Sequence, residues 1–202
     1  MFAIIEAAGW PIWPLILCSV IALAIIGERM WSLRQSVVMP QHLLAWAVQE
    51  HRQNGVTADM LQRLATNSPL GQIFEAGLRN VQSAPGIMKE AIEEAGRAVA
   101  IDLERFLTSL GTIAAIGPLL GLFGTVIGMI EIFGSQTPSG TNPIVLAHGI
   151  SIALYNTAFG LVVAVPSMIF YRYYRAKVDA LLVDMELQAI KLIELIHGER
   201  NT

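Results

Sequence analysis

The chain has little charge, a single cysteine and no cluster of basic residues. Charged residues make up 14% of the 202 residues against 54% hydrophobic residues, and the 13 Lys and Arg residues are scattered. Nucleic-acid binding needs cations gathered opposite phosphates, so no nucleic-acid partner is expected. The lone Cys18 excludes an intrachain disulfide. The chain is richer in apolar residues than an ordinary globular domain.

Residue patterns typical of catalysis or metal binding are also missing. The histidines lie far apart in the sequence, and no Ser/His/Asp set is discernible. The stretch Gly117–Thr125 has the glycines of a phosphate-binding loop, but it lacks the lysine that such a loop places before its hydroxyl residue. We therefore expect no metal, no cofactor and no enzymatic activity.

Three long apolar stretches dominate what is present. Residues 7–27, 106–130 and 132–171 contain no formal charge, and the third is broken only by the turn-rich segment 134–143. A helix needs about 20 apolar residues to cross a bilayer, where its backbone must satisfy its own hydrogen bonds. The sequence predicts an all-α membrane protein with three transmembrane helices. Glu28 and Arg29, rather than a small-residue cleavage site, follow the first stretch, so we expect an uncleaved span and not a signal peptide.

The positive charges predict the orientation. Every Lys and Arg falls within 29–105 or 172–200, and such residues favour the cytoplasmic side. The expected organisation is an outside N-terminus (1–8), transmembrane helix 1 (9–27), a cytoplasmic helical segment (28–105), transmembrane helix 2 (106–133), an outside loop (134–143), transmembrane helix 3 (144–171) and a cytoplasmic helical tail (172–202).

The cytoplasmic parts show amphipathic helical periodicity. Thr57 and Ser68 are candidate helix caps. From about Ile87 the apolar residues recur at helical spacing with no Pro or strong stop before Gly117–Pro118, which predicts one helix running unbroken into span two. Span three should likewise continue to about Glu199. The apolar stripes of these extensions predict a bundle of long helices, covered within the subunit or by its neighbours.

Small residues form a stripe along each of the last two spans. They are Gly117, Gly121, Gly124 and Gly128 in span two, and Gly149, Ala153, Gly160 and Ala164 in span three. Small residues let helices approach closely, although glycine destabilises a helix by about 1 kcal/mol relative to alanine. The spacing fits tight helix packing, or a narrow path whose hydroxyls, with Thr125 and Thr157 beside the stripes, hold water or pass a proton. Glu131 either marks the outer end of span two or has a functional role.

These residues resemble a known family. The stretches Leu110–Ile130, Gly149–Leu161 and Val165–Pro166 resemble the ExbB/TolQ/MotA proton-channel family, in particular its ExbB/TolQ branch with three spans. Ser68–Gly77 and Glu28–Leu33 also resemble segments of the family.

The resemblance implies a bacterial inner-membrane subunit with a periplasmic N-terminus and a cytoplasmic C-terminus. It would form a ring, pentameric in this family, around the single helices of an ExbD/TolR-like partner. Proton motive force would then energise a TonB-like protein for outer-membrane transport. A TolQ-like role with a TolA-like protein in envelope integrity and cell division is the alternative, as is a passive membrane scaffold.

The resemblance also assigns roles to individual residues. Thr125 and Thr157 match pore-lining threonines of the family, and Pro166 matches a proline near the end of span three. Many ExbB and TolQ members carry a glutamate where this chain has Ile152. Our hypothesis is that the wall of the ring lines the proton path with polar groups, namely Thr125, Thr157, Ser151 and Asn156. Glu131 would gather protons at the outer opening of this path. The group that takes up and releases the proton would be an aspartate of the partner.

Overall fold

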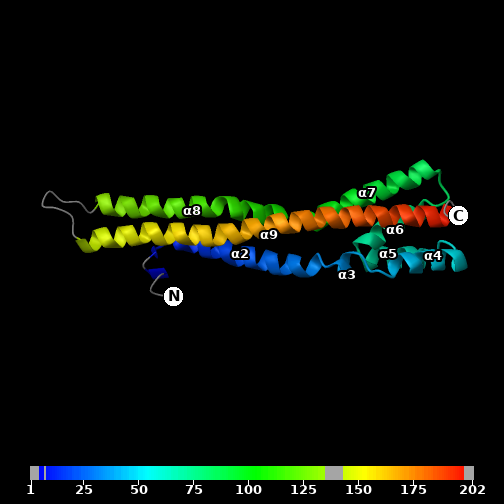
Figure 1. Cartoon of the computed structure of the whole chain (residues 1–202), viewed down its shortest axis with the longest axis horizontal. Helices are drawn as coiled ribbons and strands as arrows, with labels where there is room; N and C mark the ends of the chain where they lie inside the picture. Colours follow the sequence, from blue (N-terminus) through cyan, green and yellow to red (C-terminus); the bar gives the residue numbers. More distant parts are fainter. Residues whose placement is uncertain (1–4, 7, 135–142, 198–202) are drawn as a thin grey trace. The chain divides into compact units, whose positions relative to one another are not determined.

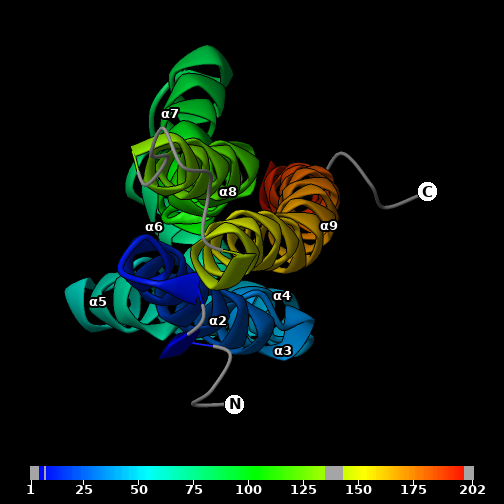
Figure 2. The same cartoon turned by 90° about the vertical axis from the view of Figure 1, so that its left-hand side faces the viewer.

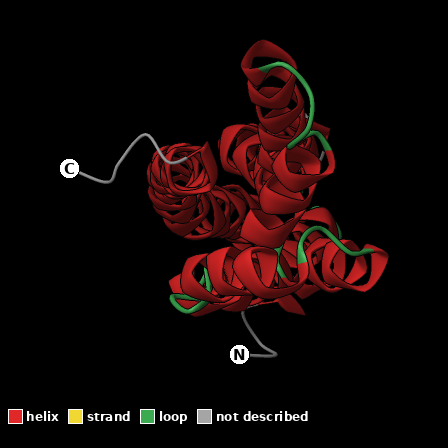
Figure 3. Cartoon of the chain, turned by 90° about the vertical axis from the view of Figure 1, so that its right-hand side faces the viewer, coloured by secondary structure: helices red, strands yellow, loops and turns green. Residues whose placement is uncertain are grey.

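The computed structural model describes residues 5–6, 8–134 and 143–197, without the side chains of Pro85 and His197, and within these ranges it contains helices and turns but no strand (Figure 3). Three helical segments are long and apolar enough to cross a membrane: Ile12–Ser32, Gly86–Gly134 and Pro143–Ile196. The predicted fold class, all-α with three spans, is confirmed. The chain divides into a span unit, Met1–Glu28 with Phe106–Tyr173, and a bundle unit, Arg29–Arg105 with Tyr174–Thr202.

The span unit is built from the first part of α2 (Ile12–Ser32), α8 (Leu107–Gly134) and the first part of α9 (Pro143–His197). α8 and this part of α9 run side by side in opposite directions (Figures 1 and 2). Large apolar side chains such as Leu23, Leu119 and Val162 are mostly exposed on the outside of these helices. Contiguous apolar surface of this kind is rare on a soluble protein and suits contact with lipid or with other helices.

The bundle unit contains α3 (Gln35–Val38), α4 (Leu43–Asn54), α5 (Ala58–Asn67), α6 (Pro69–Arg79), α7 (Pro85–Glu104) and the last part of α9. Its core is made of fully buried side chains contributed by α5, α6, α7 and α9, among them Leu64, Phe74, Leu78, Met88, Tyr174 and Met185. The predicted caps are confirmed. The amide of Met60 donates to Thr57 Oγ1 at 3.2 Å, and the amide of Gly71 donates to Ser68 Oγ at 3.1 Å.

The prediction of one helix running unbroken from Ile87 into span two is wrong. α7 ends at Glu104 and α8 begins at Leu107, and between them Phe106 takes a positive φ of 64°. In a continuing helix, the carbonyl of Leu103 would accept a hydrogen bond from the amide of the residue four positions later. Instead the buried Arg29 donates Nη1 to this carbonyl at 3.1 Å. A distant arginine thus satisfies a group that the helix end leaves open, and its charge suits the negative end of the helix dipole.

Candidate functional site

α8 and α9 touch through their backbones along the glycine stripe of α8. A Cβ atom added to Gly128 would lie 2.5 Å from the carbonyl oxygen of Gly149, and one added to Gly121 would lie 2.9 Å from the carbonyl oxygen of Asn156. Both neighbours are main-chain atoms, which cannot rotate away. Any side chain at these positions would therefore push the two helices apart.

The glycines of α9 complete the same contact from the other side. A Cβ atom on Gly160 would lie 2.7 Å from the carbonyl oxygen of Gly117, and one on Gly149 would lie 2.8 Å from that of Gly128. The two stripes therefore pack against each other, and this contact sets the positions of the polar side chains beside it.

Thr125 and Thr157 lie on the same flank of the α8–α9 pair. At about 100° per residue, Thr125 is about 80° around α8 from Gly117, and Thr157 is about 80° around α9 from Gly149, in the same rotational sense. Because the helices are antiparallel, equal rotations point both residues to one side. Both are half-buried. The Cα of Thr157 also lies 3.1 Å from the Cβ position of Gly121, one turn from Thr125.

The hydroxyls of this flank donate to their own helices. Thr125 Oγ1 donates to the carbonyl oxygen of Leu122 at 2.6 Å, and Thr157 Oγ1 donates to that of Ala153 at 3.1 Å. Such bonds occupy the hydroxyl protons, while the oxygen lone pairs can still accept a hydrogen bond from water. The flank can therefore hold water without carrying a charge.

Ser151 is separate from this pair. Its Oγ donates to the carbonyl oxygen of Ala147 at 2.9 Å in the same manner. However, it lies about 120° around α9 from Thr157 and points away from α8. The structure does not bring Ser151 to the flank that carries Thr125 and Thr157.

Asn156 is fully buried inside the span unit. Its Nδ2 donates to the carbonyl oxygen of Ala8 at 2.7 Å and to that of Ile152 at 2.8 Å. Its Oδ1 is buried without a hydrogen-bond partner in the described part of the chain. In this single chain Asn156 therefore ties the segment before α2 to α9, and it presents no surface to an open wall.

Ile152 is covered by the same segment. It is 2% exposed, and its Cδ1 lies 3.6 Å from the Cβ position of Gly9. Sequence reasoning missed this contact of the segment at Ala8 and Gly9 with α9. Gly9, which takes a φ of 70°, and Pro11 were the local signals of a turn before α2.

The two remaining predicted residues lie outside this constellation. Glu131 is exposed near the end of α8. It lies about 120° around the helix from Thr125, so the two do not share a flank. Pro166 is exposed within α9 and is not part of the buried glycine contact.

Comparison with known proteins supplies the family. Residues 65–187 match the family model described as the MotA/TolQ/ExbB proton channel family, and this range includes both threonines and both glycine stripes. The chain is 32% identical to the ExbB-like 3 biopolymer transport protein of Synechocystis sp., over 81% of this chain and 79% of that one. It is 31% identical to the biopolymer transport protein exbB1 of Vibrio cholerae (81% and 74%) and 30% identical to the Tol-Pal system protein TolQ of Pseudomonas aeruginosa (77% and 75%). The chain therefore belongs to the MotA/TolQ/ExbB proton channel family.

Proposed function

We propose that this chain is the wall subunit of an inner-membrane proton channel that works with an ExbD/TolR-like single-span partner. The complex uses the proton motive force to energise a TonB-like protein for outer-membrane transport. The N-terminus and the 134–143 loop face the periplasm, and the bundle unit faces the cytoplasm, as the distribution of Lys and Arg indicates. Relatives named as biopolymer transport proteins support the transport role.

The observation that carries the proposal is the shared flank of Thr125 and Thr157. Two hydroxyls with lone pairs available to water lie on one flank of helices that contain no Asp, Glu, Lys or Arg across residues 106–130 and 132–171. This wall can hold water and pass a proton, but it cannot store the charge itself. The carboxylate that titrates then comes from the partner helix, and Asn156 positions α9 instead of lining the path.

An exposed apolar stripe in the bundle unit supports the assembly of a ring. Val183, Leu187 and Ile190 of α9 are 56%, 51% and 45% exposed. Their alternating spacing of four and three residues is that of a coiled-coil seam. Large apolar side chains at such spacing in a part of the chain outside the bilayer need a cover. We propose that neighbouring copies in the ring, pentameric as the resemblance implies, supply this cover.

The test is proton flux into liposomes that contain this protein with its co-purified single-span partner. Flux should require the partner and should fall at least tenfold in Thr157→Val and Thr125→Val, whereas Thr157→Ser should keep most of it. Thr112→Val is the matched control, because its hydroxyl also donates to its own helix, at 2.9 Å to Thr108, but lies on a different face of α8. Intact flux in both valine variants would refute the assignment of the path. A ring that forms with the partner but never conducts would favour the passive scaffold.

A TolQ-like role is the second candidate, because the TolQ relative is about as similar to this chain as the ExbB relatives are. The two roles differ in the protein that the complex energises, which is TonB-like in the first and TolA-like in the second. Complementation separates them: a TonB-linked subunit restores energy-dependent uptake in a strain that lacks ExbB, and a TolQ-like subunit restores detergent resistance in a strain that lacks TolQ.

A further inference from the structure

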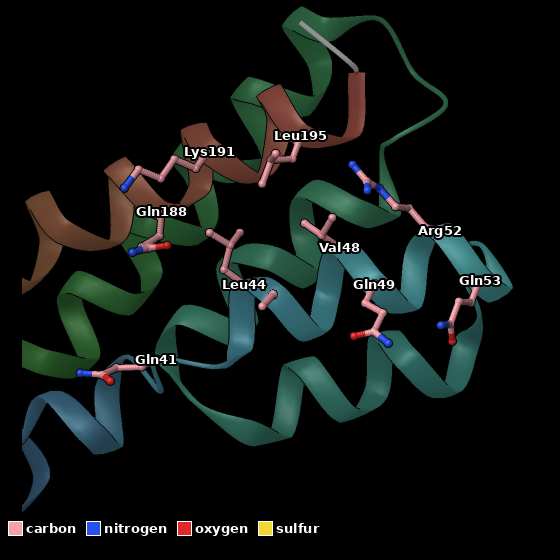
Figure 4. Close-up of a pocket in the computed structure, with 10 residues that line it drawn as sticks. Gln41, Leu44, Val48, Gln49, Arg52, Gln53, Gln188, Lys191 and Leu195 are labelled. Atoms are coloured by element: carbon pink, nitrogen blue, oxygen red, sulfur yellow. The ribbon is translucent and has the colours of Figure 1, made fainter. Parts of the chain in front are cut away.

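An open groove of about 600 Å³ lies between α4 and the last part of α9, within the bundle unit. Figure 4 shows Leu44 and Val48 projecting from α4 toward α9, with Gln188 and Leu195 on the α9 side. The groove therefore combines aliphatic side chains with amide groups. Its volume lies in the range of clefts that hold a ligand or a short peptide segment.

The charge of this groove has one sign. Arg52 of α4 and Lys191 of α9 are its ionised side chains, and no carboxylate lines it. Neither cation forms an ion pair with any residue in the described ranges. Two cations on opposite walls of one groove favour an anionic occupant, since an arginine can hold a carboxylate through two parallel hydrogen bonds.

The amides indicate what kind of anion fits. Glutamine side chains from both walls, including Gln49 and Gln188, line the groove. Each offers both a donor and an acceptor, which is what an extended peptide backbone requires. A free inorganic anion would leave the aliphatic side chains uncovered. A lipid headgroup fits poorly by position. Lys191 lies about 25 Å further along α9 than Tyr174, where the bundle unit's part of α9 begins, at ~1.5 Å per residue. This is about three times the Debye length of about 8 Å.

We propose that this groove binds an acidic stretch at the cytoplasmic end of the single-span partner. A single-span protein must have one end on each side of the membrane, so one end is available on the side of the bundle unit. This inference rests on the proposed function and orientation. Arg52 and Lys191 hold carboxylates of the stretch, the glutamines bond its backbone, and an apolar side chain lies against Val48 and Leu195. The groove thereby docks the partner at a second place, away from the proton path.

The experiment places a photo-crosslinking residue, p-benzoylphenylalanine, at Gln49 in the full complex with the partner. The exposed Gln62 of α5, which does not line the groove, is the control position. We expect an adduct of this chain with the partner from Gln49, and not from Gln62, mapped by mass spectrometry to an acidic stretch at the partner's cytoplasmic end. The double reversal Arg52→Glu with Lys191→Glu should lower this adduct at least tenfold.

Matched controls separate groove binding from general charge effects. Reversal of two exposed cations elsewhere in the unit, Arg63→Glu with Lys89→Glu, makes the same change in net charge and should leave the adduct intact. Exchanging acidic residues of the mapped stretch for lysines should restore the adduct with the Arg52 and Lys191 reversals. An adduct between two copies of this chain, an adduct insensitive to charge reversal, or no adduct above that of Gln62 would each overturn the inference.

Flux measured on the same preparations distinguishes the two proposals. If proton flux requires the partner but the partner gives no adduct at Gln49, the groove inference alone fails. If the partner is neither cross-linked nor required for flux, the proposed function fails with it.

Discussion

Replacing Gly128 with alanine should open the α8–α9 contact by a calculable amount. The added Cβ would lie 2.5 Å from the carbonyl oxygen of Gly149 and 3.0 Å from the amide nitrogen of Ala153. Ordinary carbon–oxygen contacts are about 3.3 Å or longer, so the helices must separate locally by roughly 0.8 Å. A gap of about that size forfeits a quarter to a half of the dispersion energy of each contact that it opens.

The expected net effect is a destabilisation of about 1–2 kcal/mol. Overpacking of this kind costs about 1–3 kcal/mol, and alanine returns about 0.5–1 kcal/mol through its better helix propensity. Unfolding would therefore become roughly 5–30 times more favourable. The measurement is an SDS titration in mixed micelles, followed by circular dichroism.

The matched control for this prediction is Gly27→Ala in α2. No atom lies within 4 Å of the Cβ position at Gly27. Alanine there gains helix propensity without a clash, so this variant should equal or exceed the parent in stability. If Gly128→Ala proves as stable as Gly27→Ala, the reasoning from backbone contact is refuted.

Three further predictions concern other contacts. Ile152→Glu places a carboxyl in a site that is 2% exposed, so it should cost several kcal/mol and lower the SDS midpoint well below that of Ile152→Leu; an unchanged midpoint would contradict the burial. Arg29→Met leaves the Leu103 carbonyl without its 3.1 Å donor. The free energy of unfolding should fall by about 1–3 kcal/mol, and amide hydrogen exchange at the end of α7 should become faster. Unaltered exchange would show that Arg29 does not stabilise this helix end. Leu187→Glu puts a charge on a side chain that is 51% exposed in the proposed seam, so it should dissociate the ring. The control Gln72→Glu, also at an exposed position, should leave the ring whole, with the mass of each assembly measured by light scattering. An intact ring in Leu187→Glu would show that the contact between copies lies elsewhere.

The sequence sufficed for the parts of the fold that local rules determine. Uncharged apolar stretches are long enough to predict spans, and the caps at Thr57 and Ser68 follow from the side-chain chemistry of the first helical turn. The break at Phe106 could not be predicted in this way. Neither Gly nor Pro marks it, and the hydrogen bond associated with it comes from Arg29, far away in the sequence.

In the candidate site too, the relations within one helix could be predicted from the sequence, and the contacts between distant segments could not. Helical periodicity already placed Thr125 and Thr157 beside the small residues, because that relation is internal to each helix. The burial of Asn156 depends on Ala8, which only the folded chain brings to α9. The rotation that separates Glu131 from Thr125 is, in contrast, internal to α8, so residue spacing alone predicts it.

The interruption at Phe106 bears on how mechanical load travels through the molecule. The chain passes between the two units at three places: within α2, at residues 105–106, and within α9. An intact helix resists twisting because each turn is bonded to the next, and α9 continues as a single helix from Pro143 to His197. At residues 105–106 that ladder is absent, because Arg105 (φ −50°, ψ 137°) and Phe106 (φ 64°) both leave the helical conformation, so a twist there changes the dihedral angles of these two residues. α9 carries its hydrogen-bonded turns across the unit boundary, apart from the bond that the nitrogen of Pro166 cannot donate, whereas the connection at residues 105–106 has no such ladder.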